Sequence, residues 1–201
     1  MLKRLFDIVL SVMGLVLLSP VMLGIALWIK LDSPGPVFFR QQRVGRFGVL
    51  FGIHKFRSMS ADASKHGLQI TVGNDARITR VGRFLRRTKL DELPQLIDVL
   101  LGRMSFVGPR PEVPIYVAMY PAAQREKVLS VRPGITDPAS ILYRDEGTLL
   151  AAAANPADAE RVYVEQIMPA KLDLSLGYVD SMCMTNDMRL IVSTIRQIWL
   201  R

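Results

Sequence analysis

A run of twenty-two uncharged residues, 8–29, constrains this chain more than any other feature. As an α-helix the run would extend about 33 Å, which is roughly the thickness of a bilayer's hydrocarbon core. Ser19 and Pro20 lie near its middle, where a proline removes one backbone hydrogen bond and predicts a kink. The Ser19 hydroxyl can satisfy the carbonyl that the proline leaves free. We therefore expect a helix–break–helix with two arms of about ten residues each.

Basic residues flank both ends of this apolar run. Lys3 and Arg4 precede it, and Lys30 and several arginines follow it. Positive charge marks the cytoplasmic side of a membrane segment, so both ends are predicted to lie on the same side. We predict that residues 1–31 form a re-entrant membrane helix and that residues 32–201 form a single functional unit on the cytosolic face.

Three other interpretations of the run are open. A straight helix could span the bilayer, because the length suffices. A cleaved signal peptide is disfavoured, because the run is long and ends in Trp28-Ile29-Lys30 without a small-residue cleavage site. A helix buried in a protein core is the third, although Trp28 beside Lys30 is typical of an interfacial anchor.

Positive charge is concentrated in the middle of the chain. Lys and Arg exceed Asp and Glu by 26 to 18, and residues 30–110 hold fifteen basic against six acidic residues. Such a segment binds phosphate groups, whether of nucleic acid, anionic lipid or a small substrate. Half of the residues are apolar, which excludes a disordered chain, and 201 residues suit one domain. The single cysteine, Cys183, and the absence of paired Cys and His residues predict a reducing compartment and no structural zinc.

The segment after the apolar run predicts a small β-hairpin. β-prone runs at 37–39 and 49–53 flank a glycine-rich basic turn, which is typical of two antiparallel strands. Residues 60–76 show no clear period, so we expect a polar loop with a short helix there.

Apolar residues at helical spacing predict that most of the remaining chain is helical. The expected class is α+β, mostly α-helical, with amphipathic interfacial helices around the core. The last helix, near 190–199, either packs in the core or lies on the membrane surface, and its pattern favours neither. The other helices are expected over 79–101, with an interruption at 89–94, over 113–129, and over 155–168.

Asp91 and Glu92 form the sharpest candidate site. Asp91 is an acceptable helix cap, and Pro94 fits a first helical turn. We expect the positive end of that helix to hold both carboxylates ionised and to attract phosphate oxygens. The carboxylates follow a run of basic residues, so the pair suits phosphoryl chemistry: one oxygen attacks phosphorus or binds a divalent ion, while guanidinium groups neutralise developing charge. The basic residues are Arg77, Arg80, Arg83, Arg86, Arg87 and Lys89.

A purely structural interpretation of the pair is that both residues cap a helix and bind surface arginines. That interpretation would be preferred for an isolated Asp-Glu. It gives no reason for an arginine run and a membrane hairpin in the same chain, which together indicate a phosphate reaction at a membrane surface.

Seven strings of this sequence, in order over most of the chain, carry a resemblance to a known family. A chance match to one string is easy, whereas a chance match to all of them is not. The chain resembles the bacterial sugar transferases, the monotopic phosphoglycosyl transferases that start glycoconjugate assembly. The strings are 19–20, 32–39, 42–45, 55–59, 83–96, 104–111 and 132–136.

The resemblance implies a transfer of sugar 1-phosphate from a UDP-sugar to undecaprenyl phosphate. UMP is released and a polyprenyl diphosphate sugar forms, as the first membrane step of glycoconjugate or exopolysaccharide assembly. By position, Asp91 would be the nucleophile of a covalent phosphosugar intermediate, and Glu92 would place the metal or the acceptor. Mg²⁺ would bind at Asp91 and Glu92. The implied location is the cytoplasmic face of the bacterial inner membrane, and a homo-oligomer is possible.

The same resemblance supplies candidate phosphate ligands and one departure. Ser19 and Pro20 match the family's helix break, whereas Tyr178 and Asp187 receive no task. Residues 137–140 depart from the glycine that many members have at this point, which leaves the choice of sugar undetermined. The chain resembles a minimal catalytic version without further domains. The candidate phosphate ligands are Lys55, Arg57, Arg86, Arg110 and, as a weaker choice, Arg132.

Two other functions fit parts of the sequence. A membrane-attached scaffold could bind anionic lipid through the basic middle segment without any turnover. A nucleic-acid binder is disfavoured, because the basic segment has no recognisable module and few aromatic residues for stacking. The expected partners are therefore the UDP-sugar, polyprenol phosphate and membrane lipid.

Overall fold

The computed structural model describes residues 1–60, 75–153 and 155–199. Most of the expected loop at 60–76 therefore lies outside the described residues. The helices are α1 Leu2–Asp32, α2 Arg80–Thr88, α3 Gln95–Leu100, α4 Pro114–Val117, α5 Ala122–Leu129, α6 Pro138–Leu142, α7 Glu146–Leu150, α8 Pro156–Val162, α9 Met168–Asp180 and α10 Met184–Trp199. The strands are β1 Phe38–Val44, β2 Leu50–Phe56, β3 Ser105–Val107 and β4 Gly134–Thr136. The predicted α+β class with mainly helical content is confirmed.

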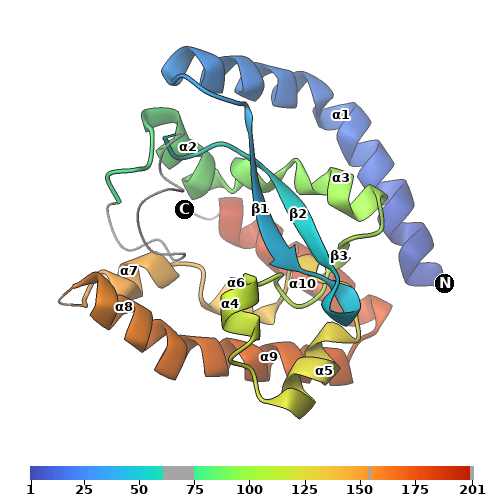
Figure 1. The fold of residues 1–201 in the computed structure, drawn as a ribbon. Coiled ribbons are helices and arrows are strands. Elements are labelled where there is room, and N and C mark those ends of the chain that lie inside the picture. The colour runs from blue at the N-terminus through green and yellow to red at the C-terminus, as the bar shows by residue number, and fades with distance from the viewer. Residues whose placement is uncertain (61–74, 154, 200–201) are drawn as a thin grey trace.

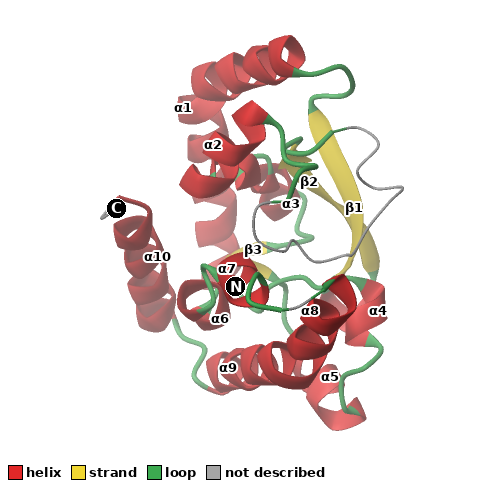
Figure 2. Ribbon diagram, turned by 90° about the vertical axis from the view of Figure 1, so that its left-hand side faces the viewer, coloured by secondary structure: helices red, strands yellow, loops and turns green. Residues whose placement is uncertain are grey.

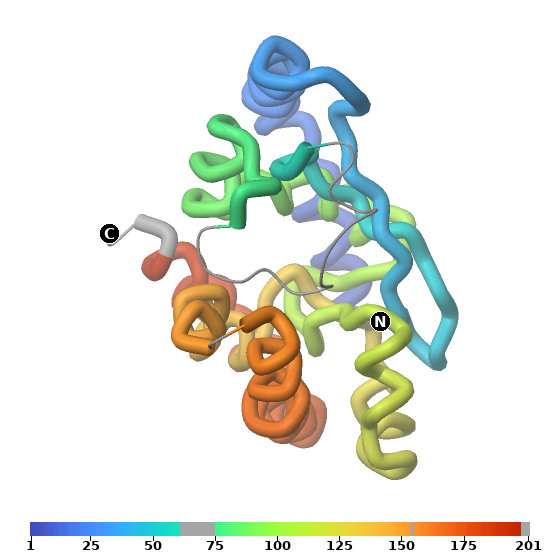
Figure 3. The backbone as a smooth tube through the Cα atoms, turned by 60° about the vertical axis from the view of Figure 1, so that its left-hand side comes forward, coloured from blue at the N-terminus to red at the C-terminus, as the bar shows by residue number. Residues whose placement is uncertain are grey.

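The elements are arranged with α1 at one end of the molecule and α5, α8 and α9 at the other (Figures 1 and 2). The long hairpin of β1 and β2 and the short helix α3 lie between these ends. The tube in Figure 3 shows the same order from a third direction. The middle of the chain, which holds the acidic pair, thus lies between the apolar helix and the helical C-terminal half.

The apolar run forms one helix, α1, with Pro20 inside it. Ser19 Oγ donates a hydrogen bond to the Val16 carbonyl at 2.8 Å. That carbonyl lies four residues before Pro20, which has no N–H to offer it, so the predicted role of Ser19 is confirmed. The helix continues through Pro20, and the predicted break is a bend between two arms that Figure 1 shows running in different directions. A re-entrant path through a membrane stays a prediction.

The surface of α1 is unlike that of a helix in a protein core. By length and composition it could cross a membrane, and only 11% of its most apolar stretch is buried inside the protein. A core helix would be mostly buried, so the structure does not support that alternative. The side that does face the protein carries Asp7 and Ser11 as well as Ile25 and Ile29.

The hairpin prediction is confirmed, with longer strands than expected. β1 and β2 are antiparallel, with Phe38 opposite Phe56 and Val44 opposite Leu50. Phe47 and Gly48 have φ values of 59° and 79°, and this left-handed backbone lets the chain reverse direction between the two strands.

A parallel pair of short strands, β3 and β4, was not predicted. Gly108 and Gly134 meet beside this pair, and a Cβ atom on Gly134 would lie 2.1 Å from Gly108 N. Only glycine permits that approach of the two backbones. The pair brings the residues after β3 next to those after β4.

The C-terminal half is helical, with boundaries that differ from those expected. Pro121 separates α4 from α5 where one helix was predicted over 113–129. Asn155 Oδ1 accepts a hydrogen bond from Asp158 N at 2.9 Å, so the predicted cap of α8 is confirmed. The helix does not end at Met168, because a π-helical turn, Tyr163–Ile167, joins α8 to α9.

The last helix, α10, packs against the protein, and a position on the membrane surface stays a prediction. Thr194 contacts Thr136 through their hydroxyl groups at 2.6 Å, and Asp187 is buried against the Tyr178 hydroxyl at 2.7 Å. Val192 and Ile195 are exposed. The helix therefore packs on the protein through part of its surface and leaves apolar side chains uncovered elsewhere.

Candidate active site

A short turn between two helices carries the adjacent acidic residues. α2 begins after Thr79, whose hydroxyl accepts a hydrogen bond from Gly82 N at 2.9 Å, and it ends at Lys89, whose backbone is left-handed with φ 58°. A 3-10 turn, Leu90–Glu92, follows, and α3 starts after Pro94. Proline has no N–H to donate, so it is best tolerated where a helix starts. The predicted interruption of the helix is thus confirmed.

Asp91 does not cap a helix, so that expectation from the sequence is wrong. Asp91 lies within the 3-10 turn, and the residue at the N-cap position of α3 is Pro94, which has no side-chain acceptor. The Asp91 residue is only 7% exposed, and its Oδ1 atom has no hydrogen-bond partner among the described residues. A buried oxygen without a partner has lost its hydration without replacement, which is rare in folded proteins. Asp91 Oδ1 therefore keeps a capacity to accept hydrogen bonds that no described residue uses.

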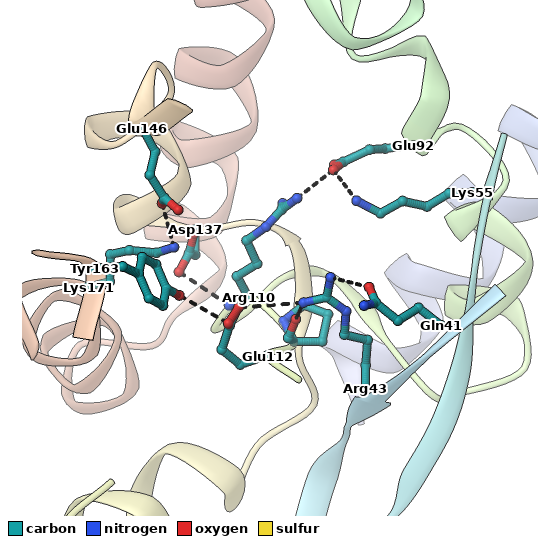
Figure 4. A network of polar contacts seen from close by, with 11 residues as sticks. Gln41, Arg43, Lys55, Glu92, Arg110, Glu112, Asp137, Glu146, Tyr163 and Lys171 are labelled. Atoms are coloured by element: carbon teal, nitrogen blue, oxygen red, sulfur yellow. Dashed lines mark hydrogen bonds and ion pairs between the residues drawn. The ribbon is translucent and has the colours of Figure 1, made fainter. Parts of the chain in front are cut away.

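Glu92 is held by two cations that come from different parts of the chain. Its Oε1 atom accepts hydrogen bonds from Lys55 Nζ at 2.8 Å and from Arg110 Nη2 at 2.6 Å (Figure 4). Lys55 is on β2, and Arg110 follows β3. The fold thus brings together three of the predicted site residues, because Lys55 and Arg110 both bind one carboxylate oxygen of Glu92.

The two neighbouring carboxyl groups differ in their electrostatics. Burial alone would raise the pKa of Glu92, but the charges of Arg110 and Lys55 hold that pKa well below its ordinary value. Burial, and then the negative charge of Glu92, raise the pKa of Asp91. The expectation that both groups are held ionised is therefore supported for Glu92, whereas the shift of Asp91 runs in the opposite direction. Burial is the main cause, and the charges of Lys55, Lys89 and Arg86, which lower the pKa of Asp91, offset it only in part.

Arg86, on α2, completes the positive surroundings of Asp91. Its Nε donates a hydrogen bond to Ser58 Oγ at 3.0 Å. Burial lowers the pKa of Arg86, and the nearby charge of Asp91 opposes that shift. The structure therefore places Arg86 close enough to Asp91 for their charges to interact.

Arg57 lies at the end of α1. Its Nη2 atom donates hydrogen bonds to Ser33 O at 2.7 Å and Ser33 Oγ at 2.9 Å, and more weakly to Ile29 O at 3.3 Å. Its Nε and Nη1 atoms are buried and have no hydrogen-bond partner in the described part of the chain. Arg57 thus binds the C-terminal end of α1 and keeps two donors unused. A role in phosphate binding stays a prediction.

Arg132 lies beside the C-terminal end of α3, which is the end away from the acidic pair. Its Nε donates a hydrogen bond to Gly102 O at 2.8 Å. Burial, followed by the charges of Arg4 and Arg46, lowers the pKa of Arg132. No contact in the described residues joins it to Glu92 or Asp91, so its phosphate role also stays a prediction.

Sequence reasoning did not assign a role to Asp137, which fixes the position of Arg110. Asp137 is fully buried and accepts hydrogen bonds from Arg110 N at 3.3 Å and Ser140 N at 2.7 Å. An aspartate followed by proline is a recognisable helix start, so the sequence did contain a signal for this cap.

A second group of charges, also missed, lies beside Arg110 (Figure 4). Glu112 accepts a hydrogen bond from the Tyr163 hydroxyl at 3.0 Å and pairs with Arg43 at 3.5 Å. Burial first, and then the charge of Glu112, raise the pKa of Tyr163. These contacts join the hairpin to the C-terminal helices around the loop that carries Arg110.

The acidic pair fits Mg²⁺. Carboxylate oxygens are preferred ligands of this ion, and the unpartnered Oδ1 of Asp91 supplies one. Among the described residues no group of three or more His, Cys, Asp or Glu side chains could enclose a metal. Mg²⁺ commonly binds one or two carboxylates together with substrate phosphates, so a pair of carboxylates is a sufficient protein contribution.

Comparisons with known proteins show what this chain is similar to. The family model described as "Bacterial sugar transferase" matches residues 1–201. The UDP-N-acetylgalactosamine-undecaprenyl-phosphate N-acetylgalactosaminephosphotransferase of Aeromonas hydrophila is 38% identical over 98% of this chain, and the exopolysaccharide production protein PSS of Rhizobium leguminosarum bv. phaseoli is 41% identical over 96%. The UDP-glucose:undecaprenyl-phosphate glucose-1-phosphate transferase of Escherichia coli is 49% identical over 83%. The matches cover 43%, 93% and 36% of these three relatives, so this chain spans less than half of two of them.

Proposed function

Because the chain belongs to the bacterial sugar transferase family, we propose that it transfers a sugar 1-phosphate from a UDP-sugar to undecaprenyl phosphate. Two of the relatives above carry names that specify a transfer of this kind. One observation in this chain carries the proposal: a buried aspartate with an unpartnered oxygen lies beside a glutamate that binds two cations. That arrangement combines a nucleophile with positive charge for a phosphoryl group.

In the first step of the proposed reaction, an Asp91 carboxylate oxygen attacks the phosphorus that bears the sugar. A bond forms between that oxygen and phosphorus, and the bond from phosphorus to the bridging oxygen of UMP breaks. UMP leaves with the bridging oxygen and its electron pair. The raised pKa of Asp91 makes its ionised form a stronger nucleophile than an exposed aspartate.

In the second step, a phosphate oxygen of undecaprenyl phosphate attacks the same phosphorus. The bond between phosphorus and Asp91 breaks, which releases the carboxylate and the polyprenyl diphosphate sugar. The two-step course means that the soluble donor and the lipid acceptor need not be bound together. Glu92 holds Lys55 and Arg110 near the reacting phosphate, where their charges stabilise the transition state.

Asp91 and Glu92 would hold Mg²⁺ together with phosphate oxygens of the donor. Bound there, the ion would neutralise charge on the diphosphate and on the departing UMP. Lys55, Arg110 and Arg86 supply the remaining positive charge from the protein.

We place the reaction at the cytoplasmic face of the bacterial inner membrane. The apolar surface of α1 supports attachment to a bilayer, and the central basic segment suits two phosphorylated substrates. The product would be the first lipid-linked intermediate of a glycoconjugate or exopolysaccharide.

The test is UMP release from a panel of UDP-sugars with polyprenol phosphate and Mg²⁺. Asp91→Asn should abolish release, whereas Asp180→Asn, at a carboxylate that is 62% exposed on α9, should leave it unchanged. Incubation of the wild-type protein with donor alone should add the mass of one sugar phosphate to the chain, and Asp91→Asn should not. Normal turnover by Asp91→Asn would refute the mechanism. Binding to anionic liposomes without UMP release from any donor would favour the scaffold instead.

A further inference from the structure

The first turn of α1 binds the far end of the helix that follows the acidic pair. Arg4 Nη1 donates a hydrogen bond to Val99 O at 2.6 Å, and Arg4 Nη2 donates one to Leu100 O at 2.8 Å. Val99 and Leu100 are the last residues of α3. Helix C-termini present carbonyls without intrahelical partners and a partial negative charge, so a guanidinium is a suitable ligand for them.

α3 depends on such contacts because it is only six residues long. An isolated helix of this length is not stable in water, so neighbouring elements must hold it. The hairpin holds one side, since Asp98 accepts hydrogen bonds from His54 N and His54 Nδ1, both at 2.8 Å. α1 holds another side: a Cβ atom on Gly14 would lie 3.1 Å from Leu96 Cδ1, so the two helices pack closely there.

The turn at the end of α3 is surrounded by two arginines. Arg132 binds Gly102 O at 2.8 Å, and Gly102 has a left-handed φ of 78°. A Cβ atom on Gly102 would lie 3.3 Å from Arg4 Nη2. The carbonyls at and just after the C-terminal end of α3 are therefore bound by side chains from α1 and from the segment before β4.

The opposite end of α3 adjoins the acidic pair. Leu90 and Leu93, on either side of Asp91 and Glu92, pack against the apolar cluster in which Ile29 of α1 takes part. α1 thus supports the segment from α2 to α3 at two places. Arg4 binds the C-terminal end of α3, and Ile29 belongs to the cluster against which the acidic turn packs. Among the described residues, Arg4 makes no hydrogen bond or ion pair with either carboxylate, so any effect on them passes through α3.

We propose that Arg4 is a positioning residue for the acidic pair: by holding the C-terminal end of α3, it fixes where Asp91 and Glu92 lie relative to the membrane helix. The proposal rests on the transferase function proposed above. It also gives Arg4 a role besides that of a positive charge flanking the apolar run. In the same geometry Arg132 supports α3 from a second direction.

The test compares Arg4→Ala, Arg4→Lys and Lys30→Ala in the full chain, embedded in nanodiscs. Lys30→Ala is the matched control, because it removes one exposed positive charge from α1. In Arg4→Ala, kcat for UMP release should fall roughly 10- to 100-fold, since small displacements of reacting groups have effects of that size. The KM values for donor and acceptor should stay within about twofold, because no binding group is removed. Arg4→Lys should fall between, since an ammonium keeps the charge but not the fork that reaches two carbonyls.

Hydrogen exchange gives a readout that does not need turnover. Amides of residues 95–104 should exchange faster in Arg4→Ala than in the wild-type protein or in Lys30→Ala, with α9 unchanged. A wild-type kcat in Arg4→Ala would overturn the proposal, and so would a change confined to the KM of the lipid acceptor. If Arg4→Ala loses protection throughout the chain, Arg4→Lys decides: reduced kcat with faster exchange only at 95–104 supports the proposal, and wild-type kcat overturns it. If the wild-type protein releases no UMP, the proposed function fails, while exchange still tells whether Arg4 holds α3.

Discussion

Replacement of Glu92 by Gln tests whether one carboxylate holds the cations of the site together. The change keeps the size of the side chain and removes the negative charge that binds Lys55 Nζ at 2.8 Å and Arg110 Nη2 at 2.6 Å. The pKa of Glu92 is well below its ordinary value, so the wild-type group is ionised at neutral pH. In Glu92→Gln, two neighbouring cations lose their common counter-charge.

The expected loss of stability follows from the burial of this group. Removing one partner of a buried ion pair costs about 3–5 kcal/mol, because the remaining charge is left without compensation. The side chains of Glu92, Lys55 and Arg110 are 10%, 16% and 30% exposed, so water screens part of the interaction. We therefore expect the lower end, about 3 kcal/mol. For a chain of this size that corresponds to a fall in Tm of roughly 6–12 °C.

Thermal unfolding of the wild-type protein, Glu92→Gln and the exposed control Asp180→Asn in the same detergent measures this difference. A carboxyl whose pKa is depressed in the folded state stabilises above its unfolded pKa, and that stability is lost as the pH falls through the folded pKa. The Tm difference should therefore be largest near neutral pH and should begin to shrink below about pH 4.3. A Tm for Glu92→Gln within about 2 °C of the wild type at pH 7 would refute the reasoning.

Three further outcomes are expected. The negative charge of Glu92 contributes to the raised pKa of Asp91, so Glu92→Gln should move the acid limb of the kcat/KM profile to lower pH; a limb that does not move would contradict the coupling. A Cβ atom on Gly82 would lie 1.9 Å from Ser58 O, whereas one on Gly24 meets nothing within 4 Å. Gly82→Ala should therefore lower stability by about 1–3 kcal/mol more than Gly24→Ala, measured by thermal unfolding, and equal effects would be inconsistent with this packing. Cysteine labels at the two ends of α1 should report the same side of the membrane, and labels on opposite sides would establish a spanning helix.

Local elements could be predicted from the sequence because their signals act over a few residues. Pro20 removes a donor and Ser19 satisfies the carbonyl involved, both within four positions. Asn155 caps α8 in the expected way, and the two β-prone runs on either side of the basic turn form the hairpin. The α+β class follows from such elements taken together.

Which basic residue binds which acceptor could not be predicted, because these pairings depend on contacts between distant segments. Lys55 and Arg110 reach Glu92 from 37 and 18 positions away, whereas Arg57 and Arg132 bind backbone carbonyls at the ends of helices. In the sequence these four residues are equivalent positive charges beside family motifs. Only packing decides which of them faces a carboxylate.

Two smaller differences from the prediction concern Asp91 and the strands β3 and β4. Asp91 has the residue type of a helix cap, but the left-handed backbone of Lys89 places it in a separate 3-10 turn. Strands β3 and β4 have three residues each, too few for an alternating pattern, and their pairing depends on the close approach of Gly108 and Gly134.

The two sides of α1, one exposed and apolar and one packed on the protein, connect the biogenesis of this protein to its proposed chemistry. Most of its apolar stretch is not buried inside the protein, yet Ile25 and Ile29 belong to the same buried cluster as Val81 and Leu85 of α2. A chain released into water without a membrane would have to hide this helix in an aggregate or leave the cluster incomplete. We expect such chains to lack an ordered acidic turn. Under the proposed function, insertion of α1 would precede formation of the acidic turn, so the reactive carboxylate would form only beside the lipid substrate.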